Sequence, residues 1–135
     1  MDLSNLDTRR ASEEGAWLTL RHPATDRPIL DESTGAPVRI KLLGKDSKAY
    51  QSRAMQLAQR HIGAGLGRKK VDLEAMSEED TELLASATVA WEYIVVDHES
   101  LSCSTSNART LYERFPWIKE QVQLFIGSRE AFLGN

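Results

Sequence analysis

Apolar and polar residues alternate along the first third of the chain, a period of two that is typical of β-strands. The alternation is clear in residues 16–21 and 38–42, and Pro28–Asp31 suits a short edge strand. The connecting segments are rich in Pro, Gly, Asp and Thr, which favour turns. We therefore predict a small antiparallel β-meander in residues 15–44. Two or three short strands are not stable alone, so one face should pack on helices.

After Gly44, apolar residues recur at the spacing of an α-helix. A first helix is predicted from a cap at Asp46 or Ser47 to about His61, because a short side-chain oxygen at the cap accepts an orphan backbone N–H. Its core side is formed by Tyr50, Ala54, Leu57, Ala58 and His61 or Ile62.

A second helix is predicted to begin at a Ser77 cap, where three acidic residues complement the positive end of the helix dipole. Its broad apolar stripe makes it the expected central core helix: Leu83, Leu84, Ala87, Ala90, Trp91, Ile94 and Val95. Residues 93–96 are β-branched or aromatic, so the helix ends there or gives way to an extended segment. Residues 97–103 are predicted to form a loop.

The last third of the chain, Ser104 to Phe132, predicts two short helices that meet at Phe115-Pro116, with proline at the first helical position. The second is expected to run to Phe132. One side of it is apolar apart from an arginine: Ile118, Val122, Phe125, Arg129 and Phe132, widened by Trp117 and Leu124. This stripe favours a core position, but a small domain has limited core for so many aromatic rings. Another chain is the alternative partner.

Together these elements predict an α+β fold, a mainly α-helical single domain with a small N-terminal antiparallel β-meander packed on helices. We expect residues 1–14 to be a flexible tail, since they carry mixed charges and no apolar run. Residues 15–135 would form the domain, with the meander in 15–44 and the helical part in 46–133. The length of 135 residues suits one domain.

Composition narrows the class of protein. The net charge of -3 argues mildly against a general nucleic-acid binder, which normally has a basic face. Cys103 is the only cysteine, so no intramolecular disulfide can form, and a reducing cytoplasm is expected. The sequence has no run of about 18 apolar residues, so we expect a soluble protein that does not contact a membrane.

Three segments suggest chemistry or nucleic-acid binding, but each has a simpler interpretation. Gly63, Gly65 and Gly67 precede a run of cations, yet the spacing is wrong for a phosphate-binding loop and no hydroxyl residue follows the lysines. His98, Glu99 and Cys103 provide too few ligands for structural zinc, and a nucleophilic cysteine would need a base within reach. We expect no enzymatic activity, metal or cofactor.

The third segment is the C-terminal helix pair, which imitates a helix-turn-helix. A recognition helix should present Arg, Lys, Asn or Gln near its start, whereas this one begins with Trp117, Ile118, Lys119 and Glu120. DNA binding is therefore not favoured. Arg129 lies on the apolar side, where such a residue more often pairs with an acid or snorkels than contacts a ligand.

A series of sequence pieces follows one order along the chain. The pieces are Trp17-Leu18-x-Leu20-x-His22-Pro23-x-Thr25, Val38-x-Ile40-x-Leu42-Leu43-Gly44-x-Asp46-Ser47-x-x-Tyr50, Trp91 on the predicted central helix, Ser104-x-x-Asn107-Ala108-x-x-Leu111-Tyr112, Pro116-Trp117-Ile118-x-x-Gln121-Val122-x-x-Phe125 and Arg129-x-x-Phe132-Leu133. In the order of these pieces, the sequence resembles the tail assembly chaperones of long-tailed bacteriophages and prophages. The resemblance covers nearly all of the chain after the first fifteen residues.

The resemblance implies a non-enzymatic role in virion morphogenesis. Such chaperones bind the long helical tape-measure protein in the cytoplasm of the bacterial host before the tail tube polymerises, and they are absent from the mature virion. Many are also made in a longer, frameshifted form, so this chain would be the short form, and self-association is a further expectation. The alternatives are another phage virion component, such as a connector or tail subunit, and a small DNA-binding regulator.

The family supplies no fixed site motif, so the contact surface has to be chosen from the residues themselves. We expect partner or self contacts on the C-terminal helices, where aromatic and polar side chains lie at helical spacing. The candidate partner-binding residues are Tyr112, Trp117, Gln121, Phe125, Arg129 and Phe132.

Overall fold

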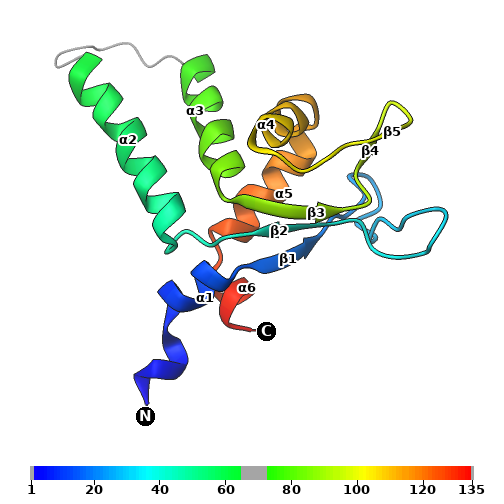
Figure 1. The fold of residues 1–135 in the computed structure, drawn as a ribbon, viewed down its shortest axis with the longest axis horizontal. Coiled ribbons are helices and arrows are strands. Elements are labelled where there is room, and N and C mark those ends of the chain that lie inside the picture. Colours follow the sequence, from blue (N-terminus) through cyan, green and yellow to red (C-terminus); the bar gives the residue numbers. More distant parts are fainter. Residues whose placement is uncertain (1, 65–72, 135) are drawn as a thin grey trace.

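The computed structural model describes residues 2–64 and 73–134 and has an α+β fold, as the sequence predicts. Figure 1 shows the arrangement, with a sheet across the middle of the molecule and helices on both sides of it. The elements of the described part are η1 (Leu3–Leu6), α1 (Thr8–Glu14), β1 (Ala16–Thr19), β2 (Arg39–Leu42), α2 (Lys48–Ala64), α3 (Leu73–Ser86), β3 (Thr88–Glu92), β4 (Val95–Val96), β5 (Glu99–Ser100), α4 (Thr105–Arg114), α5 (Pro116–Ile126) and α6 (Arg129–Leu133).

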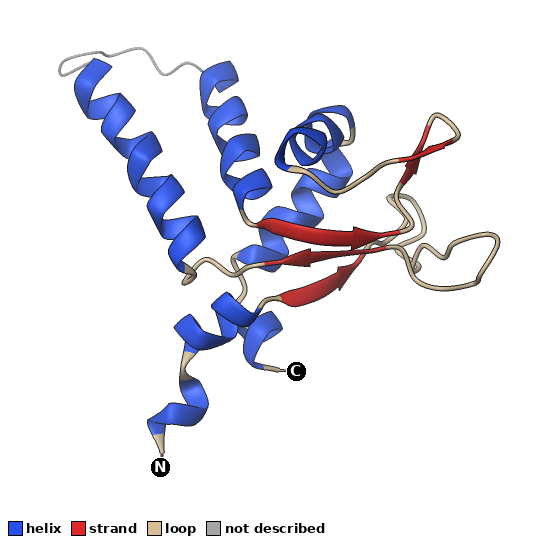
Figure 2. Cartoon of the chain, viewed as in Figure 1, coloured by secondary structure: helices blue, strands red, loops and turns tan. Residues whose placement is uncertain are grey.

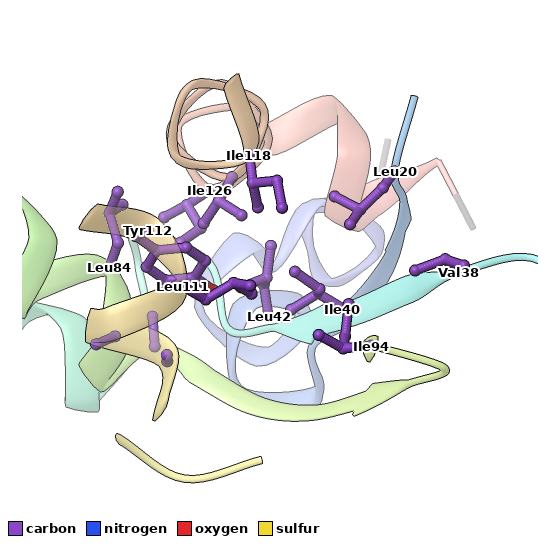
Figure 3. Close-up of a cluster of buried hydrophobic side chains, with 14 residues drawn as sticks. Leu20, Val38, Ile40, Leu42, Leu84, Ile94, Leu111, Tyr112, Ile118 and Ile126 are labelled. Carbon is purple, nitrogen blue, oxygen red and sulfur yellow. The ribbon is translucent and has the colours of Figure 1, made fainter. Parts of the chain in front are cut away.

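The main sheet is antiparallel in the order β1-β2-β3, with β2 in the centre (Figure 2). Leu18 pairs with Ile40, and Ile40 pairs with Trp91, so apolar side chains share one face. That face packs against α4, α5 and the end of α3, and Figure 3 shows Ile40 and Leu42 meeting Leu111, Tyr112, Ile118 and Ile126 there. The predicted packing of an antiparallel sheet on helices is confirmed.

The third strand of this sheet comes from a segment that the sequence analysis assigned to a helix. α3 ends at Ser86, and β3 pairs with β2 from Thr88 onwards, so Trp91 lies on a strand rather than on the central helix. The prediction was wrong because short apolar runs fit both periods. β2 has backbone groups that β1 leaves unpaired, and the β-branched and aromatic residues of β3 favour a strand that pairs with them.

The proposed edge strand at residues 28–31 also differs. The segment between β1 and β2, residues 20–38, is here called the β1–β2 extension, and it contains only the isolated bridges Arg21–Pro28 and Leu30–Pro37. Each bridge includes a proline, which has no backbone N–H to continue a ladder. Backbone hydrogen bonds still tie the extension together, because Ile29 donates to the Leu20 carbonyl and Val38 to the Ile29 carbonyl, both at 2.9 Å.

Helices α2 and α3 pack against each other and rise together from one end of the sheet (Figure 1). The cap prediction for α2 is confirmed at Ser47, whose Oγ accepts a hydrogen bond from the Tyr50 backbone N–H at 3.2 Å. Leu57 is buried on the predicted core side, but Ala58 is exposed. α3 begins at Leu73, before the predicted Ser77 cap, and residues 65–72 of the glycine-rich basic stretch lie outside the described residues.

The predicted loop at residues 97–103 contains a strand. β4 and β5 form a short hairpin in which Val95 pairs with Ser100 and Val96 with Glu99. Its two central residues, Asp97 and His98, have φ angles of 52° and 67°, which matches the tight turn that suits the twist of a hairpin. Histidine is not a usual residue for such a turn, so residue types alone did not predict the hairpin.

The C-terminal helices meet at Phe115-Pro116 as predicted, with Ser104 Oγ accepting from the Asn107 N–H at 3.0 Å to cap α4. The second helix was predicted to reach Phe132, but α5 ends at Ile126. The chain then turns at Gly127, and Ser128 caps a separate short helix, α6. Consequently Arg129 and Phe132 do not continue the stripe of α5, and Leu124 is exposed on its outer side.

The expectation of a flexible tail was wrong for residues 8–14. Asp7 Oδ1 accepts a hydrogen bond from the Arg10 N–H at 3.0 Å and caps α1, which packs against α6 (Figure 1). Ser12 is buried, and its carbonyl accepts from the Gly44 N–H at 3.1 Å. A Cβ at Gly44 would lie 2.8 Å from Ser12 Cβ, so glycine is what allows α1 to approach this closely.

Candidate functional site

The six residues predicted to bind a partner do not form one surface. Tyr112 and Phe132 are buried, and the Tyr112 hydroxyl lies 2.6 Å from Thr88 Oγ1. Phe125 packs edge-on against Phe132, with ring centroids 5.3 Å apart. These three side chains hold helices together within the domain, so the sequence-based choice of residues mixed core positions with exposed ones.

The polar residues of that set also bind within the chain. The Gln121 side chain accepts from the Arg21 N–H at 2.9 Å and donates to the Arg21 carbonyl at 2.8 Å, which fixes the start of the β1–β2 extension on α5. Arg129 makes a two-point ion pair with Asp46, with N–O distances of 2.7 and 3.0 Å. Trp117, in contrast, lines a surface cavity.

The Arg129–Asp46 pair predicts a pH dependence of stability. The hydrogen bond from Arg129 lowers the pKa of Asp46 from 3.8 to about 2. A carboxyl group with a lowered pKa stabilises the folded state above its unfolded pKa, and this contribution is lost as pH falls. We therefore expect the free energy of unfolding of Asp46→Asn to fall less than that of the wild type between about pH 5 and 2. Urea unfolding at a series of pH values measures this, and parallel curves would contradict it.

The cavity that Trp117 lines is an open, mainly apolar groove of about 560 Å³. Three parts of the chain that are distant in sequence form it: the β1–β2 extension, the segment from Tyr93 through β4, and the α4–α5 junction. The lining residues are Leu20, Ile29, Leu30, Asp31, Glu32, Ser33, Val38, Tyr93, Ile94, Val95, Val96, Leu111, Phe115, Trp117 and Ile118. We call this surface the groove.

Large apolar side chains are exposed along the groove. Leu30 and Val95 are each 54% exposed and Tyr93 is 42% exposed, and all three line the groove together with buried core residues. A single exposed apolar residue is ordinary, but several that share one concave surface are typical of a binding site. Sequence reasoning placed none of these three residues in a site, because only the fold brings residues 30 and 95 together.

Tyr93 has a strained backbone. Its φ angle is 63°, in the left-handed region that bulky residues rarely adopt, and it turns the chain between β3 and β4. Such a conformation costs about 1–2 kcal/mol for a residue other than glycine. Strained residues persist mainly at binding and active sites.

A matched pair of substitutions tests this strain. We expect Tyr93→Gly to have a free energy of unfolding about 1 kcal/mol higher than that of Tyr93→Ala. Both variants lose the ring, but only glycine adopts a positive φ without cost. Urea denaturation of the two proteins measures the difference, and equal stabilities would show that position 93 is unstrained.

The β4–β5 hairpin beside the groove is fixed to α4. Arg114 donates to both carboxylate oxygens of Asp97, at 2.6 and 2.8 Å, and its guanidinium lies 5.3 Å from the Phe115 ring centroid. These hydrogen bonds lower the pKa of Asp97 and raise that of Arg114, so both stay charged. This ion pair ties the hairpin, whose residues Val95 and Val96 line the groove, to α4.

Of the segments that suggested chemistry, the structure describes the one that contains His98, Glu99 and Cys103. No three His, Cys, Asp or Glu residues gather to hold a metal ion in the described ranges, 2–64 and 73–134. Burial raises the pKa of the Cys103 thiol, which favours the less nucleophilic protonated form. His98 and Glu99 lie at the exposed turn of the β4–β5 hairpin.

Comparison of the chain with protein-family models, with curated proteins and with solved structures gives no match. Among the described helices, none is both long enough and apolar enough to cross a membrane. Functional assignment therefore depends on the groove and on the sequence resemblance to phage tail assembly chaperones.

Proposed function

We propose that the protein acts by binding, without catalysis, an amphipathic helix of a partner protein in the groove. The observation that supports this most strongly is the row of exposed apolar side chains, Leu30, Tyr93 and Val95, along a concave surface. Amphipathic helices bind to hydrophobic grooves through apolar anchors one turn apart. The partner that we propose is a phage tape-measure protein, which is what the resemblance to tail assembly chaperones implies.

The volume of the groove would also suit a small molecule, since such sites span roughly 300–1,000 Å³. A small-molecule site normally brings several polar groups together around its ligand. Here the charged and hydroxyl-bearing lining residues, apart from Tyr93, are the consecutive residues Asp31, Glu32 and Ser33. The remaining lining is apolar, which suits the apolar stripe of a helix better.

A chaperone for a long partner does not need tight individual contacts. Several copies bound along one tape-measure chain would cover its apolar stripe and keep it soluble, and repeated weak sites gain from multivalency. This role needs a groove and no chemistry. It also agrees with the expected release of such chaperones before the tail is complete.

Co-expression with the tape-measure protein encoded nearby tests the proposal. The expected result is that the partner becomes soluble and is captured by affinity pull-down. Size-exclusion chromatography with light scattering should show several copies of this protein on each partner. A partner that stays insoluble, with this protein eluting alone, would refute the proposal. Recovery of the protein in purified virions would instead indicate a connector or tail subunit.

A further inference from the structure

We propose that the groove selects a helix that carries Lys or Arg beside its apolar stripe. This inference depends on the proposed function, because it specifies the chemistry of the partner helix. The groove supplies two complementary features, an apolar lining for the stripe and a carboxylate pair at Asp31 and Glu32 for the cations.

The charged side chains that line the groove are negative. Asp31 and Glu32 are its charged lining residues, and no cationic side chain of the described part of the chain lines it. Neither carboxylate forms an ion pair with a described residue, in contrast to Asp46, Glu82, Glu92 and Asp97. A carboxylate pair without a cation, beside exposed apolar groups, is complementary to a basic amphipathic segment.

The Asp31 carboxylate is held in place by its neighbours in the chain. Its Oδ2 accepts three hydrogen bonds, from Ser33 Oγ at 2.8 Å, the Thr34 N–H at 3.0 Å and Thr34 Oγ1 at 2.9 Å. These bonds stabilise the ionised form, which is the form that accepts a hydrogen bond from Lys or Arg.

The geometry of a helix suits this arrangement. Residues three or four apart on a helix lie about 5–6 Å apart, so a cation can flank each apolar anchor. Lys and Arg lay their aliphatic stems on apolar surface while the charged head reaches a polar group. Leu30 precedes Asp31 directly in the chain, so the groove places apolar surface and carboxylate next to each other.

Tyr93 adds an exposed aromatic ring to the same groove. It lines the same groove, its side chain is partly exposed, and its backbone is strained. A tyrosine ring offers apolar area at a low cost in conformational entropy and a face that attracts cations. The ring would therefore favour the same basic, amphipathic helix that the carboxylates favour.

Three synthetic amphipathic peptides test the inference. They share one apolar stripe of Leu and Ala and differ only in their flanking residues, which are Lys, Gln or Glu. Isothermal calorimetry with the full-length protein should show that the Lys peptide binds about tenfold tighter than the Gln peptide at low salt, and the Glu peptide weakest. The preference should shrink at high salt, because salt screens exposed charges.

Two double variants locate the preference. In Asp31→Asn/Glu32→Gln the charge of the groove is removed while hydrogen-bond acceptors are kept, and the Lys and Gln peptides should bind equally. Glu113→Gln/Glu130→Gln removes the same charge at exposed positions outside the groove and should keep the preference. Amide chemical shifts of Tyr93 and Leu30 in NMR spectra should move on binding.

The outcomes separate this inference from the proposed function. Equal binding of the Lys and Glu peptides, no binding of any peptide, or a preference that survives in Asp31→Asn/Glu32→Gln would overturn the inference. Binding of the tape-measure protein together with such a result would leave the proposed function standing. A groove-dependent Lys preference without tape-measure binding would support the inference and refute the proposed partner.

Discussion

Tyr112→Ala is expected to lower the free energy of unfolding by about 3–5 kcal/mol, the cost of truncating a buried aromatic side chain. Tyr112 is 1% exposed and packs between the sheet and α5, where Figure 3 shows it against Ile126 and Leu111. Removing the ring leaves a cavity that the strands and helices around it cannot close completely. A small domain has only about 5–15 kcal/mol of stability in total, so this loss is severe.

Tyr112→Phe is the matched control, because it keeps the ring and removes only the hydroxyl. Thr88 Oγ1 still donates to the Leu84 carbonyl at 2.9 Å, so no buried group loses its last partner. We expect a loss of about 0.5–1.5 kcal/mol. Urea unfolding followed by circular dichroism measures both variants. If Tyr112→Ala kept wild-type stability but lost partner binding, the residue would belong to the contact surface that the sequence predicted.

The second large effect is expected on binding rather than on stability. Leu30→Gln/Val95→Gln should weaken binding of the tape-measure protein about 100-fold or more, because a few central anchors, each worth about 2 kcal/mol or more, dominate the binding energy of an interface. Both side chains are 54% exposed, so the free energy of unfolding should change by less than about 1 kcal/mol. Neutral glutamine leaves the charge of the groove unchanged, which keeps this test separate from the charge test.

Leu124→Gln is the control for that variant. Leu124 is 70% exposed on α5 and does not line the groove, so the same change in polarity there should leave affinity unchanged. Pull-down and calorimetry compare the three proteins. Equal affinity of Leu30→Gln/Val95→Gln and the wild type would mean that the partner binds elsewhere, and a loss in Leu124→Gln alone would direct attention to the outer side of α5.

Several local features were predictable because short-range chemistry decides them. The helix boundary at Phe115-Pro116 and the Ser47 cap depend on a missing N–H and on a side-chain oxygen close in sequence to the N–H that it binds. The strand at residues 39–42 followed from alternation with one face buried. In contrast, Trp91 was assigned to a helix because its neighbours show apolar spacing that suits either structure, and only pairing with β2 decides between them.

The predicted contact residues failed as a set for a related reason. A helical stripe shows which side chains share a face, but it does not show whether that face meets the core or the solvent. The break at Gly127 moves Arg129 and Phe132 off the line of α5, where Arg129 pairs with Asp46 and Phe132 with Phe125. Apolar spacing does not show that break, whereas the Gly127 turn and the Ser128 cap are local features of the sequence that mark it.

By itself, the sequence determined the α+β class, the strands at residues 16–19 and 39–42 and the C-terminal helix pair. Periodicity, capping and proline act over a few residues, and they leave direct traces in the order of residue types. Only the tertiary structure decided which strand completes the sheet, which aromatic rings are buried and where the groove lies. Those features depend on how segments that are distant in sequence pack together, as with Leu30, Val95 and Trp117, which line one groove only once the chain has folded.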